Sequence, residues 1–229
     1  MLGKVSGVEV MGKNIAYFEG AQGFLVKPKE TGTYPGIVMV HEWWGLNDNI
    51  RATAETLAKE GYVVLAVDLY HGEVATTRER AQELRNTLTK EAGIANLKAA
   101  VKHLRNENAQ KIASLGWCFG GGKSLELALS GEKLDATVIY YGSLNIDRKE
   151  LKKISWPVLG IFGEEDSSIP TSTVHKFRDA LTSLGITNNI HIYPGVGHAF
   201  ANPSGASYAA NETKDAWQKT VAFLEQTLK

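Results

Sequence analysis

The chain has 229 residues, of which 43% are hydrophobic and 22% charged, as expected for a single globular domain over residues 1–229. Its 25 lysines and arginines balance 25 aspartates and glutamates, so the net charge of zero gives no electrostatic footprint for nucleic acid or an anionic membrane. We therefore expect a small-molecule substrate, no nucleic-acid or membrane partner, and a monomer or small homo-oligomer.

The chain contains one cysteine, Cys118, which excludes an internal disulfide and fits a reducing compartment. No apolar run approaches the roughly 18 residues that a membrane span needs. Residues 1–14 also lack the apolar segment of a signal peptide. These features together predict a cytoplasmic location.

Short apolar runs alternate with helical patterns along the chain. Uninterrupted runs such as IVMV and VVLAV are typical of strands that are buried on both faces of a parallel sheet. The pattern predicts, in chain order, strands at 23–26 and 36–41, a helix at 47–60, a strand at 62–67, helices at 78–88 and 91–105, a strand at 112–116, a helix at 119–129, strands at 136–141 and 158–162, a helix at 170–184, a strand at 189–193 and a helix at 211–228. Strands that alternate with helices predict an α/β fold with a mostly parallel, doubly wound sheet and helices on both faces. Functional residues should then follow the carboxyl ends of strands.

The segment GWCFG lies between a predicted strand and a predicted helix. It matches the nucleophile elbow of α/β-hydrolases, with Cys118 in the place of the commoner serine. Small residues at Gly116 and Gly120 let strand and helix approach closely. The helix N-terminus stabilises a thiolate, and the Phe119 N–H is placed to bind an oxyanion. The alternative is a small buried thiol in a glycine-rich turn.

Two later loops supply an acid and a base in the chain order of α/β-hydrolases, nucleophile, then acid, then base. Asp166 follows the predicted strand 158–162, with Glu164 and Glu165 as rivals. His198 follows the strand 189–193 in a glycine-rich loop. The order and the strand-end positions together predict a Cys118–His198–Asp166 triad rather than a solvated acidic loop and a structural histidine.

The remaining histidines show no spacing typical of metal ligands, so we expect no metal site among them. His41 and His71 each follow a strand and are candidates for the rim of a pocket.

The loop after strand 36–41 carries Glu42 and a pair of tryptophans. Its position matches the second oxyanion donor of the fold, so the Trp43 N–H is a candidate. Glu42 is expected to hold the thiol proton and to swing away when substrate binds; the alternative is a surface salt bridge. Trp44 and Trp117 are candidates for aromatic walls of an apolar cavity.

These segments carry a resemblance to the dienelactone hydrolases, also called carboxymethylenebutenolidases. The matching pieces are HEWWGLN, AVDLY, GWCFGGG, GEED and GVGHAF, which span residues 36–205 in the family's order. The resemblance implies the same triad, the glutamate at Glu42 and oxyanion donors at Trp43 and Phe119. It also implies opening of an enol-lactone through an acyl-enzyme, without metal or cofactor.

The sequence differs from the family in the residues that hold the substrate carboxylate. Members of the family hold this group with two arginines, one of them four residues after the triad histidine, where this chain has Asn202. Arg78 and Arg80 are both candidates for the other. Phe200, in the same loop as Asn202, is a further candidate for substrate contact. Because asparagine cannot replace a bidentate arginine, a neutral ester, thioester or other lactone becomes an alternative substrate.

Three functions are consistent with the sequence. The first is hydrolysis of small esters or enol-lactones. The second is a carboxylesterase or thioesterase for neutral substrates on the same fold, which a substrate profile would distinguish. The third is a non-catalytic ligand-binding protein, against which the complete set of triad residues argues.

Overall fold

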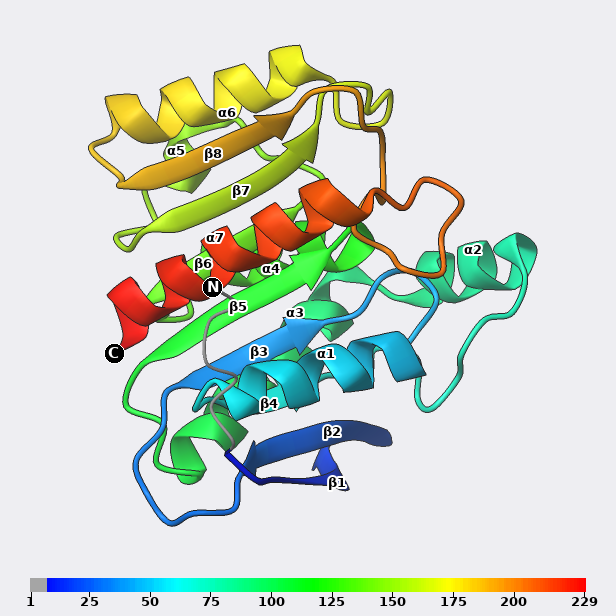
Figure 1. Ribbon diagram of the computed structural model, residues 1–229, viewed down its shortest axis with the longest axis vertical. Coiled ribbons are helices and arrows are strands. Elements are labelled where there is room, and N and C mark those ends of the chain that lie inside the picture. Colours follow the sequence, from blue (N-terminus) through cyan, green and yellow to red (C-terminus); the bar gives the residue numbers. More distant parts are fainter. Residues whose placement is uncertain (1–7) are drawn as a thin grey trace. The chain divides into compact units, whose positions relative to one another are not determined.

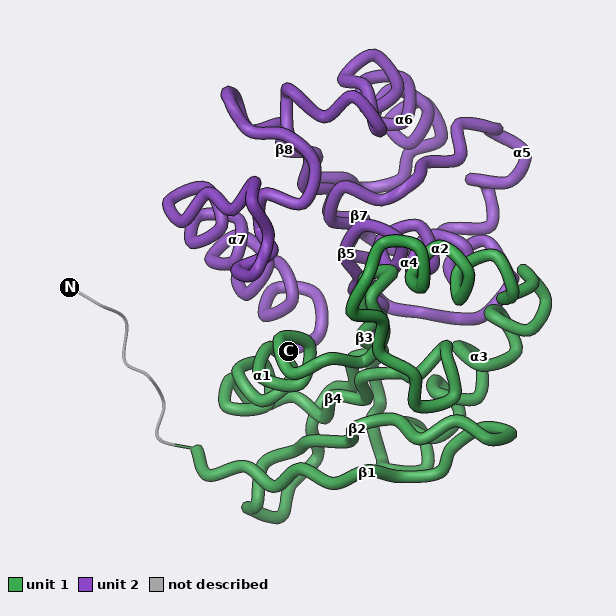
Figure 2. Tube along the Cα trace, turned by 90° about the vertical axis from the view of Figure 1, so that its right-hand side faces the viewer, with its two compact units in different colours: residues 1–112 green, residues 113–229 purple. Residues whose placement is uncertain are grey.

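The computed structural model describes residues 8–229. We expect no signal peptide in residues 1–14, and the first seven of these lie outside the described residues. The chain divides into two compact units, residues 1–112 and 113–229 (Figure 2). The single domain expected over residues 1–229 stays a prediction.

Unit 1 is built on four strands in the spatial order β1-β2-β4-β3. β1 and β2 pair antiparallel, as do β2 and β4, whereas β3 and β4 pair parallel. Within this unit α1 packs on one face of the strands and α3 on the other (Figure 2). The elements are β1 (Val10–Phe18), β2 (Ala21–Pro28), β3 (Gly36–Val40), α1 (Asp48–Lys59), β4 (Val63–Ala66), α2 (Arg78–Thr87) and α3 (Lys90–Asn106).

Local sequence explains these elements. All residues of β3 and β4 are buried, as their unbroken apolar runs predict. Helix α1 begins after Asn47, whose side chain accepts a hydrogen bond from the Ile50 N–H at 3.2 Å. It ends before Gly61, which adopts the left-handed conformation, with φ of 88°.

Unit 2 contains four parallel strands in the order β5-β6-β7-β8. Within this unit α4 and α7 lie on opposite sides of the strands, and α6 packs on β7 and β8 (Figures 1 and 2). The elements are β5 (Ile112–Trp117), α4 (Phe119–Leu129), β6 (Ala136–Tyr140), α5 (Arg148–Leu151), β7 (Val158–Gly163), α6 (Thr171–Ser183), β8 (Asn188–Tyr193) and α7 (Ala210–Leu228).

The structure contains every predicted strand and helix and adds two elements, β1 and α5. The sequence analysis missed β1 because all of its residues are exposed or half-buried, so it lacks a buried apolar run. It missed α5 because a single turn of helix is too short for a periodic pattern. In unit 2, Cys118, Asp166 and His198 all follow carboxyl ends of strands, as expected for a site in a parallel sheet.

Candidate active site

Cys118 occupies the turn between β5 and α4. Its backbone has φ of 54° and ψ of −117°, a region that residues other than glycine rarely adopt. The Cys118 N–H donates to the Tyr140 carbonyl oxygen at 2.9 Å and so ties the turn to the neighbouring strand β6. Backbone strain of this kind persists where the surrounding structure enforces it, and it is concentrated at functional sites.

Two glycines let the strand, the turn and the helix approach one another. A Cβ atom at Gly116 would lie 2.2 Å from the Gly120 carbonyl oxygen, and one at Gly121 would lie 2.6 Å from that of Tyr140. Both neighbours are backbone atoms, which cannot move aside without displacing the elbow. This close approach explains why the residue two positions before Cys118 is a glycine.

The structure brings His198 between Cys118 and Asp166. The His198 Nε2 atom lies 3.0 Å from Cys118 Sγ, and Nδ1 lies 2.7 Å from Asp166 Oδ2. Cys118 follows β5, Asp166 lies in the loop after β7, and His198 lies in the loop after β8. An imidazole in this position can accept the thiol proton on one nitrogen while the carboxylate orients the other.

Asp166, rather than either neighbouring glutamate, is the acid that reaches the imidazole. Its side chain is buried, whereas Glu164 and Glu165 are exposed. Asp166 Oδ1 accepts hydrogen bonds from the N–H groups of Ser168 at 2.8 Å and Ile169 at 3.0 Å. These bonds fix the carboxylate, so that its second oxygen faces the imidazole.

The pair of acid and base is charged at neutral pH. Burial lowers the pKa of His198, but the hydrogen bonds and charges of Asp166 and Cys118 outweigh burial and raise this pKa to about 10. Burial raises the pKa of Asp166, but the bond to His198 and the backbone N–H groups bring it below its ordinary value. An imidazolium therefore faces the carboxylate on one side and the sulfur on the other.

Tyr141 is a residue of this site that the sequence analysis missed. Its ring lies edge to face with the His198 imidazole, with centroids 5.3 Å apart, and its side chain is fully buried. The predicted strand 136–141 included this residue, but β6 ends one residue earlier, at Tyr140. Tyr141 therefore stands at the carboxyl end of a strand, where functional residues were expected.

Glu42, Trp43 and Trp44 follow β3 in unit 1. Glu42 is 7% exposed, and the two tryptophan rings contact each other edge to face with centroids 5.2 Å apart. The Trp44 carbonyl oxygen accepts the Ala75 N–H at 2.8 Å, which holds this loop against the segment before α2. The roles predicted for these residues beside the thiol stay predictions.

His41, a candidate for the pocket rim, is instead fully buried. Its Nδ1–H donates to the Glu42 carbonyl oxygen at 2.5 Å, and its Nε2 accepts the Leu69 N–H at 3.2 Å. Burial lowers the pKa of His41 to about 4, so the ring is neutral at physiological pH. The imidazole therefore ties the loop after β3 to the loop after β4.

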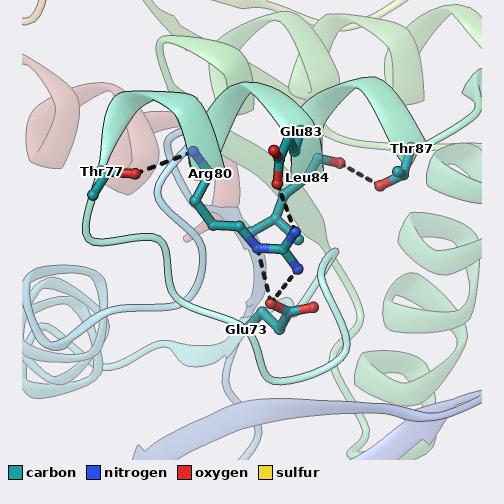
Figure 3. Close-up of polar contacts among 6 residues, drawn as sticks. All are labelled: Glu73, Thr77, Arg80, Glu83, Leu84 and Thr87. Carbon is teal, nitrogen blue, oxygen red and sulfur yellow. Dashed lines mark hydrogen bonds and ion pairs between the residues drawn. The ribbon is translucent and has the colours of Figure 1, made fainter.

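Arg78 and Arg80, the candidates for a substrate anchor, lie at the start of α2. The Arg80 guanidinium contacts Glu73 Oε2 at 2.6 Å and Glu83 Oε2 at 2.8 Å (Figure 3). Arg78 is exposed and forms no ion pair with any residue in the described range 8–229. Two carboxylates thus already bind Arg80, which weakens its case as an anchor for a substrate carboxylate.

The remaining candidates for substrate contact lie in unit 2. Trp117 is 7% exposed and Phe200 is fully buried. Their rings pack against core tyrosines with centroids 5.3 to 5.6 Å apart. Asn202 Oδ1 accepts the Ser204 N–H at 2.9 Å, so part of its side chain shapes its own loop. Direct substrate contacts of these three residues stay predictions.

Within residues 8–229, no three or more His, Cys, Asp and Glu side chains are arranged to hold a metal ion. None of the helices in the described residues is long and apolar enough to cross a membrane.

Several known proteins are similar to this chain along most of its length. A protein of Saccharolobus solfataricus that carries the provisional name carboxymethylenebutenolidase is 29% identical over 96% of this chain and all of its own length. A Synechocystis protein with the same provisional name is 30% identical over 90% of this chain and 92% of its own. Protein usf of Aquifex pyrophilus is 31% identical over 90% of this chain and 94% of its own.

Solved structures confirm the fold class. The crystal structure of a protein from Klebsiella pneumoniae, provisionally identified as a dienelactone hydrolase, superposes with a TM-score of 0.86 at 28% identity, over 95% of this chain and 99% of that one. The metagenomic phosphotriesterase P91, described as dienelactone hydrolase-like, superposes with a TM-score of 0.85 at 24% identity, over 97% of this chain and all of that one. The predicted α/β-hydrolase fold is therefore correct. Because the profile of the dienelactone hydrolase family matches residues 21–228, the chain belongs to this family and is a hydrolase that acts on carboxylic ester bonds.

Proposed function

We propose that this hydrolase cleaves small esters or lactones with Cys118 as nucleophile, His198 as general base and acid, and Asp166 as the residue that orients the imidazole. The observation that carries the proposal is the distance of 3.0 Å between His198 Nε2 and Cys118 Sγ, at an elbow with strained backbone. The raised pKa of His198 supports its proposed role as the group that delivers a proton to the leaving oxygen.

The proposed reaction has two halves. The thiolate attacks the carbonyl carbon, and the carbonyl oxygen becomes an oxyanion. Its collapse breaks the bond to the leaving oxygen, which takes the proton from the His198 imidazolium and leaves a thioester on Cys118. His198 then accepts a proton from water, whose oxygen attacks the thioester and releases the acid and the thiolate. With a lactone, the leaving hydroxyl or enol stays in the same product molecule.

Backbone N–H groups are proposed to stabilise the oxyanion. Phe119 is the first residue of α4, where amide N–H groups point toward the helix N-terminus and its positive dipole end. The Trp43 N–H is the proposed second donor, by its position after β3. Removing one such donor costs about 100- to 1,000-fold in rate in related chemistry.

Glu42 is proposed to hold the thiol proton before substrate binds. Glu42 is 7% exposed, and burial favours the neutral, protonated form of a carboxyl group. A negative charge that stayed beside the oxyanion would oppose catalysis, so Glu42 must move or become neutral during the reaction.

A neutral substrate is the second candidate. Asn202 stands where family members hold the substrate carboxylate, and its side-chain oxygen already binds its own loop. Arg80 is bound by two glutamates. These contacts favour an uncharged ester, thioester or lactone over a carboxylated enol-lactone. The nucleophilic thiol also needs reducing conditions, which supports a cytoplasmic location.

The test is turnover of p-nitrophenyl acetate, a carboxylated enol-lactone and an uncharged lactone by the wild type, Cys118→Ala and His198→Gln. His175→Gln, in which an exposed histidine of α6 is changed, serves as the matched control. We expect turnover that both active-site variants abolish and the control retains. Activity that persists in Cys118→Ala would refute the proposal. The preferred lactone decides between the charged and the neutral substrate class.

A further inference from the structure

Tyr193, the last residue of β8, is held by helix α7. It is 8% exposed, and its hydroxyl donates to Asp215 Oδ2 at 2.7 Å. Lys219, one turn further along α7, pairs with the same carboxylate oxygen, and its ammonium lies 5.8 Å from the centre of the Tyr193 ring. The ring is therefore fixed both by burial and by a charge-assisted hydrogen bond.

A series of contacts between aromatic rings connects Tyr193 to His198, the proposed general base. The Tyr193 ring lies 5.3 Å from Phe200, Phe200 lies 5.6 Å from Tyr141, and Tyr141 lies 5.3 Å from the His198 imidazole, measured between centroids. All four rings belong to unit 2, and both Phe200 and Tyr141 are fully buried. Close-packed rings transmit a displacement because the interior offers no empty space to absorb it.

The backbone of Tyr141 and the backbone of Tyr193 are also constrained. Tyr141 has φ of 34°, which is strained for a residue with a side chain, and its N–H donates to the Ile161 carbonyl oxygen at 2.7 Å. The Tyr193 carbonyl oxygen accepts the Glu164 N–H at 2.8 Å, at the start of the loop that carries Asp166. Tyr193 therefore contacts the loop of Asp166 through its backbone and the ring of Phe200 through its side chain.

We propose that Tyr193, held by Asp215, is a positioning residue that fixes the His198 imidazole against Cys118 through Phe200 and Tyr141. The inference rests on the proposed function of the triad. It assigns to the Tyr193–Asp215 hydrogen bond an effect on the chemical step, which a bond that only stabilised the fold would not have.

The test compares Tyr193→Phe, which keeps the ring and loses the hydroxyl, with Asp215→Ala, which removes the acceptor. Asp215→Asn keeps an acceptor oxygen and should restore most of the rate. Tyr34→Phe and Asp179→Asn are matched controls, since Tyr34 binds a carbonyl oxygen in unit 1 and Asp179 forms an exposed ion pair on α6. All rates are taken per active site, counted by stoichiometric alkylation of Cys118.

We expect Tyr193→Phe and Asp215→Ala each to lower kcat about three- to tenfold with little change in KM, since a misplacement of about 1 Å costs roughly 100-fold. The double variant should be no slower than either single variant, because both remove the same bond. The rate of Cys118 alkylation by iodoacetamide at neutral pH should fall in parallel. Unchanged kcat and alkylation with only a lower Tm, or losses that multiply in the double variant, would overturn the proposal.

The alkylation readout separates this inference from the proposed function. If the wild type hydrolyses none of the esters but Tyr193→Phe still slows alkylation, the positioning role stands and the substrate assignment fails. If the wild type shows Cys118-dependent turnover that neither variant alters, the function stands and the positioning role fails.

Discussion

Replacing Asp166 by asparagine tests the triad most sharply, because the structure fixes how the new side chain must lie. Asp166 Oδ1 accepts two backbone N–H groups, at 2.8 and 3.0 Å, and only the carbonyl oxygen of an asparagine can take that place. The amide NH₂ must then face His198 Nδ1, which lies 2.7 Å from the present carboxylate oxygen. An NH₂ group donates, so Nδ1 must become an acceptor and the ring proton must move to Nε2. A neutral imidazole that already carries its proton on Nε2 cannot take the thiol proton on that nitrogen.

The expected cost follows from this change of tautomer. A triad in the wrong tautomer loses about 10,000-fold in rate, and we expect Asp166→Asn to lose at least about 1,000-fold in kcat/KM, or roughly 4 kcal/mol. The assay is p-nitrophenyl acetate hydrolysis per titrated active site, with thermal unfolding as a check on folding. Glu165→Gln is the matched control, because this exposed carboxylate lies in the same loop. A loss of less than tenfold in Asp166→Asn, or an equal loss in the control, would refute the reasoning.

Further predictions concern the elbow, the thiol and a buried histidine. Gly116→Ala should fail to fold or lose more than about 3 kcal/mol of stability, because its Cβ would lie 2.2 Å from a carbonyl oxygen; Gly131→Ala, with open space around it but a φ of 79°, should lose only about 1 kcal/mol in urea unfolding. Cys118→Ser should be far slower than the wild type on every ester, since a site that stabilises a thiolate need not deprotonate a hydroxyl; equal kcat values would contradict this. Glu42→Gln should change the pH dependence of Cys118 alkylation, and an unaltered profile would remove the proposed role of Glu42. His41 has a pKa of about 4 when folded and about 6.5 when unfolded, so the unfolded chain binds the extra proton and stability falls as the pH drops from 6.5 to 4, by up to about 3 kcal/mol. His41→Gln should flatten this part of the stability curve in urea titrations, and an equal slope in both proteins would contradict the assignment.

The sequence predicts best those strands and helices whose own residues carry the apolar pattern of a buried element. IVMV and VVLAV could be interpreted as buried strands because each run is apolar throughout, and β3 and β4 are indeed fully buried. β1 shows the opposite pattern, because all of its residues are exposed or half-buried, and its own residues do not indicate that it pairs with β2.

The same distinction applies to the candidate site, where some residues are indicated by motifs and others only by the fold. Motif and chain order were enough to select Cys118, Asp166 and His198, which the structure brings within hydrogen-bonding distance. Tyr141 and Tyr193 were not singled out, because the ring contacts join the end of β8 and the loop after it to Tyr141, which is distant in sequence. The sequence also could not show that Arg80 is held by Glu73, which lies in the loop before α2.

The central claim is that Cys118 carries the acyl group during turnover. The direct test is to mix the enzyme with p-nitrophenyl acetate and to quench the reaction in acid within the first turnover. The peptides are then mapped by mass spectrometry to find the acetyl group. We predict one acetyl group on the peptide that contains Cys118 and none in Cys118→Ala. Turnover at the wild-type rate without acylation of Cys118, or with the acetyl group on another residue, would contradict the account.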